Sequence, residues 1–149
     1  MMSEIFFIKR AADARDLPMP RYMTENASGM DLRANVQENI RLLPGGFIAI
    51  PVGIHIALPK GFEAQIRPRS GLAMKYGVSM INAPGTIDAD YRGEIHVILI
   101  NHGSAPFIIH RGDRIAQMVI APVVTPVFTE TENLPDTARG DGGFGHTGL

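Results

Sequence analysis

The chain has 149 residues, no cysteine and a net charge of -1, with 14 Lys and Arg against 15 Asp and Glu. This length suits one domain with a substantial core, and the lack of cysteine excludes disulfides and thiolate metal sites. The balanced charge argues against a nucleic-acid-binding surface, and no apolar run is long enough to span a bilayer. Because residues 1–10 are also too short and too polar for a signal peptide, we expect a cytoplasmic protein without nucleic-acid or membrane partners.

Short runs of β-branched and aromatic residues recur along the chain, separated by Gly, Pro and other turn residues. These runs predict strands at residues 5–9, 31–36, 47–52, 54–58, 62–67, 94–100, 107–109 and 114–120. Strands this short and this regularly broken favour an antiparallel sandwich or barrel. Only residues 70–76 are typical of a helix, which would make at most about two turns.

The chain changes character at Thr129, after which apolar residues become sparse and glycine dominates. Such a segment cannot bury enough surface to fold alone, so residues 129–149 are predicted to be a flexible tail beside a folded domain of residues 1–128. A disordered end is the simpler interpretation. Arg139 and Phe144 lie among the glycines, however, and a glycine-rich segment with one cation can wrap phosphates through backbone N–H groups.

Two internal segments carry groups suited to anion binding and acid–base chemistry. Arg69 and Ser70 stand where a predicted strand meets the predicted helix, which favours either an anion site or an ordinary N-cap. Asp88 and Tyr91 lie between two strands, where a carboxylate could activate water or simply belong to a solvated turn. The five histidines lack metal-ligand spacing, and neither a P-loop nor a G-x-G-x-x-G motif is present.

Each segment is weak evidence by itself, but five of them occur in a characteristic order. They are residues 27–34, 68–73, 82 with 85–93, 111–117 and 139–148. In this order they closely resemble the five motifs of the homotrimeric dUTPase family, and the resemblance runs from about residue 5 to the C-terminus.

The resemblance implies a fold, a reaction and an assembly. The fold would be all-β, a jelly-roll-like β-barrel with one short helix and a flexible Gly-rich C-terminal tail. The reaction would be hydrolysis of dUTP to dUMP and pyrophosphate, which limits uracil incorporation into DNA and supplies dUMP for dTMP synthesis. The protein would be a homotrimer with active sites shared between subunits, and residues 129–149 would form a lid carrying the fifth motif.

The resemblance also implies roles for individual residues. Asp88 would activate the water that attacks the α-phosphorus, and Tyr91 would pack under the deoxyribose and exclude a 2′-hydroxyl. Asn82, Thr86 and Ile87 would contact the uracil, on which Phe144 would stack. The phosphates would be bound by Arg69, Ser70, Gly71, Gln117, Arg139, Gly145, His146 and Thr147.

The metal implied by the resemblance is Mg²⁺, held chiefly by the triphosphate and without a direct protein ligand. Asp31 would lie near the water shell of the metal or at the subunit interface. Two positions need comment: His146 stands where the family more often has serine, and Asp90, the second acid of its motif, is assigned no chemical role.

Two other functions remain open at this point. A dCTP deaminase shares the implied fold, although Pro68, Arg69, Ser70 and Gly71 match the hydrolase better. A non-catalytic nucleotide-binding module is the second alternative, but such a module should have lost the water-activating acid or the tail motif, and Asp88, Arg139 and Phe144 are all present.

Overall fold

A computed structural model describes residues 5–143, which form eleven strands, one α-helix and one short 3-10 helix. The strands are β1 (Phe7–Arg10), β2 (Met30–Arg33), β3 (Ile40–Leu42), β4 (Phe47–Pro51), β5 (Ile54–Ala57), β6 (Phe62–Arg67), β7 (Val78–Met80), β8 (Gly85–Ile87), β9 (His96–Asn101), β10 (Phe107–Ile109) and β11 (Arg114–Pro122). The helices are η1 (Ala12–Ala14) and α1 (Ser70–Tyr76). In this part of the chain no helix is long and apolar enough to cross a membrane.

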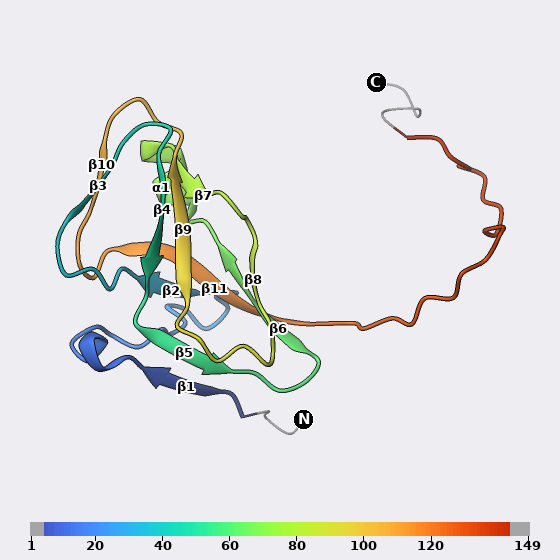
Figure 1. The fold of residues 1–149 in the computed structure, drawn as a ribbon, viewed down its shortest axis with the longest axis horizontal. Helices are drawn as coiled ribbons and strands as arrows, with labels where there is room; N and C mark the ends of the chain where they lie inside the picture. The colour runs from blue at the N-terminus through green and yellow to red at the C-terminus, as the bar shows by residue number, and fades with distance from the viewer. Residues whose placement is uncertain (1–4, 144–149) are drawn as a thin grey trace.

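All strand pairs are antiparallel, and they form four small sheets around one core (Figure 1). The largest sheet has the order β2-β11-β6-β8, and a second has the order β4-β9-β7. Strands β1 and β5 form a third sheet, and β10 and β3 form a fourth. This arrangement confirms the predicted all-β architecture.

Alternating burial along the strands explains why they face one core. In β9, Val97, Leu99 and Asn101 are buried, whereas Ile98 and Ile100 are only partly covered. Because successive side chains of a strand point to opposite faces, this pattern puts one face of the sheet inside. The same core holds buried residues from the other sheets, among them Leu32, Ile50, Ile66, Ile109 and Ile115.

The one α-helix lies where it was predicted, at Ser70–Tyr76. It ends because Gly77 adopts a left-handed conformation (φ 69°) and donates its N–H to the carbonyl oxygen of Ala73. A side chain at this position would also approach the Gly103 nitrogen to 2.7 Å. The helix therefore has a sharp stop directly before β7.

All eight predicted strands are present, but three observed strands were not predicted. These are β3, β7 and β8, each only three residues long and therefore too short to show alternation. The strand predicted at residues 31–36 is shorter than expected, since β2 ends at Arg33 and the following backbone pairs with the turn before β11.

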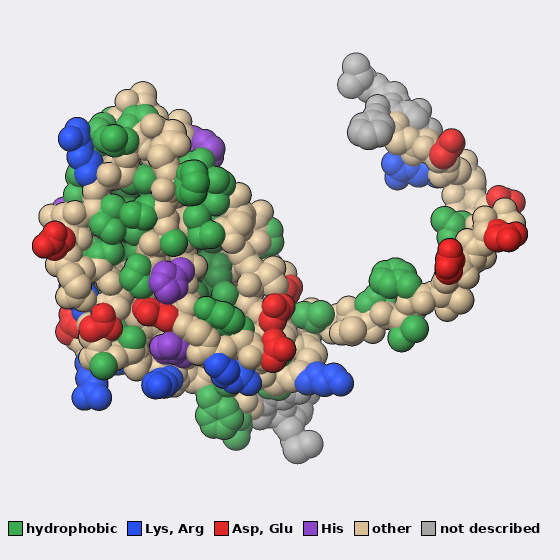
Figure 2. Space-filling model, in the orientation of Figure 1, with side chains coloured by type: hydrophobic (Ala, Val, Ile, Leu, Met, Phe, Trp, Pro, Cys, Tyr) green, Lys and Arg blue, Asp and Glu red, His purple; other side chains and the backbone are tan. Residues whose placement is uncertain are grey.

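The chain after β11 runs away from the body (Figure 1). Residues 123–143 contain no helix or strand. They nevertheless carry large apolar side chains that are almost fully exposed, including Val124, Val127 and Phe128 (Figure 2). An isolated chain thus leaves apolar surface uncovered next to its last strand.

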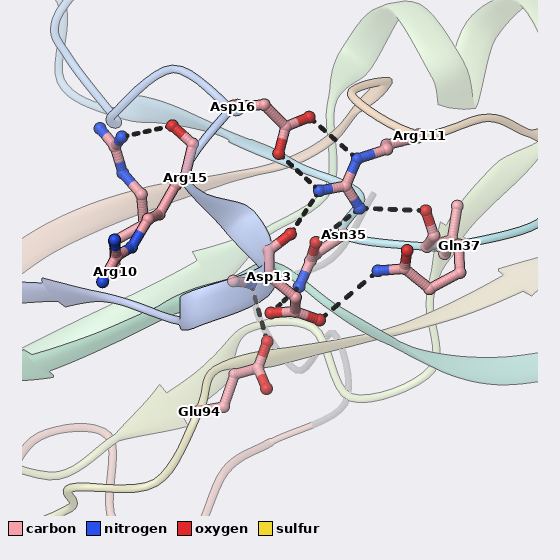
Figure 3. A network of polar contacts seen from close by, with 10 residues as sticks. Arg10, Asp13, Arg15, Asp16, Asn35, Gln37, Glu94 and Arg111 are labelled. Atoms are coloured by element: carbon pink, nitrogen blue, oxygen red, sulfur yellow. Dashed lines mark hydrogen bonds and ion pairs between the residues drawn. The ribbon is translucent and has the colours of Figure 1, made fainter.

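Arg111, in the turn before β11, ties that turn to the N-terminal segment (Figure 3). Its guanidinium donates to both carboxylate oxygens of Asp16 at 3.0 and 2.8 Å. Further bonds reach the Asn35 side chain and the carbonyl oxygens of Asp13 and Val36. All five N–H donors of Arg111 are used in this way, so the residue anchors the fold.

The hydrogen bonds from Arg111 hold the pKa of the Asp16 carboxyl below its ordinary value, and those to Asp16 raise the pKa of Arg111. A carboxyl with a lowered pKa stabilises the fold above its unfolded pKa, and this contribution disappears as the pH falls through the folded pKa. Asp16→Asn should therefore lower the free energy of unfolding at pH 7, and this difference from the wild type should disappear as the pH falls through the lowered pKa of folded Asp16. Denaturant unfolding across pH checks this, with Asp136→Asn in the exposed tail as control; a difference that persists in acid would contradict it.

Asn101 is fully buried at the end of β9. Its amide donates to the carbonyl oxygens of Leu42 and Ala105, and its side-chain oxygen accepts from the Gly103 N–H. Asn101→Ala would leave these buried groups without partners, which costs about 1–3 kcal/mol each at most sites. We expect the free energy of unfolding to fall by at least about this amount, while Asn39→Ala at an exposed position should change it by less than about 0.5 kcal/mol.

Candidate active site

One half of the candidate site is a groove of about 600 Å³ at the start of α1. We call it the arginine groove; it is lined by Gln65, Arg67, Pro68, Arg69, Ser70, Ala73, Ala83, Pro84 and Gln117. It brings together Arg69, Ser70 and Gln117, three of the residues expected to bind phosphate. Gly71 lies in the first turn of α1 but does not line the groove.

The side chains of the arginine groove are held in place by their neighbours. Asp31 on β2 accepts from Arg69 Nε at 2.9 Å and from Arg114 Nη1 at 3.2 Å. Arg69 Nη1 also donates to the Arg114 carbonyl oxygen, and Gln117 Nε2 donates to the Pro68 carbonyl oxygen at 2.9 Å. These bonds order Arg69, at the N-cap of α1, and Arg114, at the start of β11, before any anion arrives.

The second half is a hollow of about 280 Å³, which we call the Asp88 hollow. It is lined by Ala49, Ile66, Met80, Asn82, Gly85, Thr86, Ile87, Asp88, Tyr91, Glu94, His96 and Ile98. Four residues expected to contact base and sugar, Asn82, Thr86, Ile87 and Tyr91, therefore line one hollow together with Asp88, the expected water-activating acid. The Asp88 carboxylate is exposed and accepts no hydrogen bond from residues 5–143, which leaves it open to a water molecule.

Asp88 and Tyr91 are fixed relative to each other by a tight turn. The Tyr91 N–H donates to the Asp88 carbonyl oxygen at 3.1 Å. Arg92 Nη1 closes the turn by donating to the carbonyl oxygens of Ala89 and Tyr91. The acid and the ring thus belong to one rigid unit.

The arginine groove and the Asp88 hollow lie on opposite faces of β6. Ile66 lines the Asp88 hollow, whereas its neighbours Gln65 and Arg67 line the arginine groove. Since adjacent residues of a strand point in opposite directions, the two hollows belong to different sides of the sheet. Nothing in the sequence indicated that the two groups of residues lie on opposite faces of one strand.

The expected tail residues do not join either hollow. Arg139 is exposed and donates to the Gly142 carbonyl oxygen within the segment that runs away from the body. Phe144, Gly145, His146 and Thr147 lie outside the described residues.

Two residues of the site were not assigned roles from the sequence. Arg114 shares Asp31 with Arg69, and the separation of 83 residues between Arg114 and Asp31 in the sequence gave no sign of this contact. Glu94 lines the Asp88 hollow and accepts the Gly53 N–H at 2.9 Å, across 41 residues. Neither contact follows a local pattern.

The donor set suits a metal that is carried by its ligand. Among residues 5–143 no three His, Asp or Glu side chains lie close enough to hold an ion. Asp31, which binds Arg69 of the arginine groove, is already shared by two guanidinium groups. A triphosphate and water offer the oxygen ligands that Mg²⁺ takes.

Comparison with known proteins agrees with this geometry. The dUTPase family model matches residues 15–148. A deoxyuridine 5′-triphosphate nucleotidohydrolase of Thermoanaerobacter sp. (strain X514) is 59% identical over 148 residues, covering 99% of this chain and 100% of the relative.

Solved structures show the same fold. The Staphylococcus bacteriophage 80alpha dUTPase with dUPNHPP matches with a TM-score of 0.88 and 23% identity, covering 99% of this chain and 100% of that one. A mutant dUTPase from phage phi11 of S. aureus, described for its coordination of a structural Mg(II) ion, matches with a TM-score of 0.77 and 20% identity over 87% of this chain and 98% of that one. The fold is thus that of dUTPases, and on the family match and the sequence identity the chain belongs to the dUTPase family.

Proposed function

We propose that this protein is a dUTP diphosphatase, which hydrolyses dUTP to dUMP and pyrophosphate. The observation that carries the proposal is the open Asp88 carboxylate, which lies beside Tyr91 and Asn82 while a separate groove presents Arg69 and Gln117. An acid beside a nucleoside-sized hollow and an ordered phosphate-binding groove are the parts that hydrolysis of a nucleoside triphosphate requires.

Asp88 would act as the general base. Its carboxylate takes a proton from a water whose oxygen attacks the α-phosphorus; the bond to the bridging oxygen of the β-phosphate breaks, and pyrophosphate leaves. The exposure of Asp88 supports this role because water reaches it directly. General-base assistance typically accelerates a reaction about 10²–10⁴-fold.

The rest of the Asp88 hollow would recognise the nucleoside. Asn82, with Thr86 and Ile87 of β8, lines the wall where the uracil edge would be read. Tyr91 would lie under the sugar, where a ring leaves no room for a 2′-hydroxyl.

The arginine groove would hold the triphosphate. Arg69, Ser70 and Gln117 line this groove, and Gly71 follows in the first turn of α1. The Arg69 guanidinium would neutralise phosphate charge, and the neutral donors would orient the phosphates. Mg²⁺, when bound to the triphosphate, would withdraw charge from the phosphate oxygens, with Asp31 reached only through water.

We further propose a homotrimer in which each site combines the two hollows from different subunits. Three observations support this assembly. The arginine groove and the Asp88 hollow lie on opposite faces of β6. The exposed apolar residues of segment 123–128 would be buried against a neighbouring subunit. The segment with Arg139 extends away from its own body (Figure 1). Residues 1–128 would then be the barrel domain and residues 129–149 a lid that brings Arg139, Phe144, Gly145, His146 and Thr147 to a site on the trimer.

Pyrophosphate release with Mg²⁺ tests the function. The wild type should turn over dUTP and leave dCTP, dTTP and UTP nearly untouched. Asp88→Asn should reduce turnover by about 10²–10⁴-fold while keeping the affinity for a non-hydrolysable dUTP analogue, since only the proton acceptor is lost. Asp90→Asn is the matched control and should stay near wild type. Ammonia release from dCTP would instead indicate a deaminase, and nucleotide binding without turnover by the folded wild type would indicate a binding module.

Mixing two inactive variants tests the shared site. Asp88→Asn alters the Asp88 hollow and Arg69→Ala alters the arginine groove. Each variant should be inactive when it is assayed alone. Suppose that a site takes its arginine groove from one subunit and its Asp88 hollow from a neighbour. In randomly mixed trimers about a quarter of the sites then combine an unmutated arginine groove with an unmutated Asp88 hollow, so about a quarter of wild-type activity should return. Light scattering of each pure variant would confirm that it assembles.

A second mixture provides the control. Asp88→Asn and Asn82→Ala alter the same hollow, so no mixed trimer contains a complete one and activity should not return. Recovery in both mixtures, or in neither, would contradict sharing between these two hollows.

A further inference from the structure

The Tyr91 ring is held at its far end. Its hydroxyl donates to the Glu94 carbonyl oxygen at 3.0 Å, so the phenol bends back over its own chain instead of extending into solvent. Tyr91 as a whole remains 44% exposed, and it lines the Asp88 hollow. A tyrosine side chain has only two rotatable bonds, so a single hydrogen bond at its hydroxyl can fix the position of the ring.

Gly93 provides the space for this placement. A Cβ atom at residue 93 would overlap with the hydroxyl oxygen and Cζ of Tyr91 and lie 2.9 Å from Cε2. All the overlapping atoms belong to the far end of one side chain, and the backbone of Gly93 is not in the left-handed region. Alanine at residue 93 would therefore displace the Tyr91 ring while leaving the backbone conformation available.

Glu94 is itself fixed to the body. Its carboxylate accepts the Gly53 N–H at 2.9 Å (Figure 3), and the next residue, Ile95, is fully buried. The Ile95 N–H also donates to the Ile54 carbonyl oxygen at 2.9 Å. The carbonyl that receives the Tyr91 hydroxyl is thus immobilised on both sides.

We propose that Gly93 and Glu94 are positioning residues that set the depth of the Tyr91 ring in the Asp88 hollow, and thereby the preference for deoxyribose over ribose. This inference rests on the proposed function and on the place of Tyr91 under the sugar. The two sugars differ by one hydroxyl, so rejection depends on where the ring surface lies. A misplacement of about 1 Å can change a rate by about 10²-fold, which makes ring depth a controlling quantity.

The test is the ratio of kcat/KM for dUTP to kcat/KM for UTP. Gly93→Ala should lower this ratio about tenfold or more, because the ring is displaced. Tyr91→Phe keeps the ring but loses the hydrogen bond to Glu94, and should lower it by about two- to tenfold. Tyr22→Phe, the same change on a tyrosine of similar exposure away from the hollow, should leave the ratio unchanged.

Glu94 is tested by a conservative pair. Glu94→Gln retains an oxygen that accepts the Gly53 N–H and should keep the wild-type ratio, whereas Glu94→Ala releases the tether and should lower the ratio. A purely structural role would lower the melting temperature or the activity on both substrates together and would not change the ratio.

The outcomes separate the inference from the function beneath it. If the wild type does not hydrolyse dUTP, the proposed function is wrong, and the inference that rests on it is wrong as well. If the wild type prefers dUTP but folded Gly93→Ala and Tyr91→Phe both keep the ratio within twofold, the inference alone is overturned. If Gly93→Ala does not fold, Tyr91→Phe and the Glu94 pair decide the outcome.

Discussion

Strand β6 is the element on which both halves of the site depend. It pairs with β11 along its whole length, from Phe62 to Arg67, and with β8 through Ala64 to Ile66. Because alternate side chains face opposite ways, β6 places Ile66 behind the Asp88 hollow and Gln65 and Arg67 in the arginine groove. A slip of one residue in its pairing would exchange these faces and destroy both hollows. The hydrophobic core that fixes the register of β6 therefore also fixes the geometry of the site.

The charge of the arginine groove is arranged locally, since the whole chain carries a net charge of -1. Asp31 shares its carboxylate between Arg69 and Arg114, and its side chain is only 20% exposed. This acid cancels part of the positive charge that a triphosphate would meet. Asp31 also orders the Arg69 side chain during folding. If this ordering took place only when the triphosphate bound, the loss of rotamer freedom would weaken the affinity for the triphosphate. A few arginines at fixed positions can thus bind a triphosphate although the protein has no excess of positive charge.

Local patterns in the sequence predicted the features that depend on local interactions. The helix at Ser70–Tyr76 and the strands of four or more residues show their periodicity directly, and the order of the five motifs was sufficient to name the family. Strands β3, β7 and β8 were missed because each has only three residues and, unlike β10 of the same length, is not a continuous run of aromatic and β-branched residues. Two features depend on pairing between residues far apart in the sequence, which local patterns do not predict. They are the hydrogen bond between Glu94 and Gly53 and the position of the arginine groove and the Asp88 hollow on opposite faces of β6.

The proposed roles divide according to how sharply each interaction varies with distance. Excluding a hydroxyl and aligning a water are effects that change over about 1 Å, and the residues assigned to them, Tyr91 and Asp88, share one hydrogen-bonded turn beside buried Ile95. Attraction between a guanidinium and a phosphate falls only as the inverse of their separation. Arg139 can therefore act from a segment without regular structure, where a sugar-reading group could not. The rigid elements thus carry the groups whose position decides selectivity, together with Arg69 in the arginine groove, and the segment that runs away from the body would add only the further charge of Arg139.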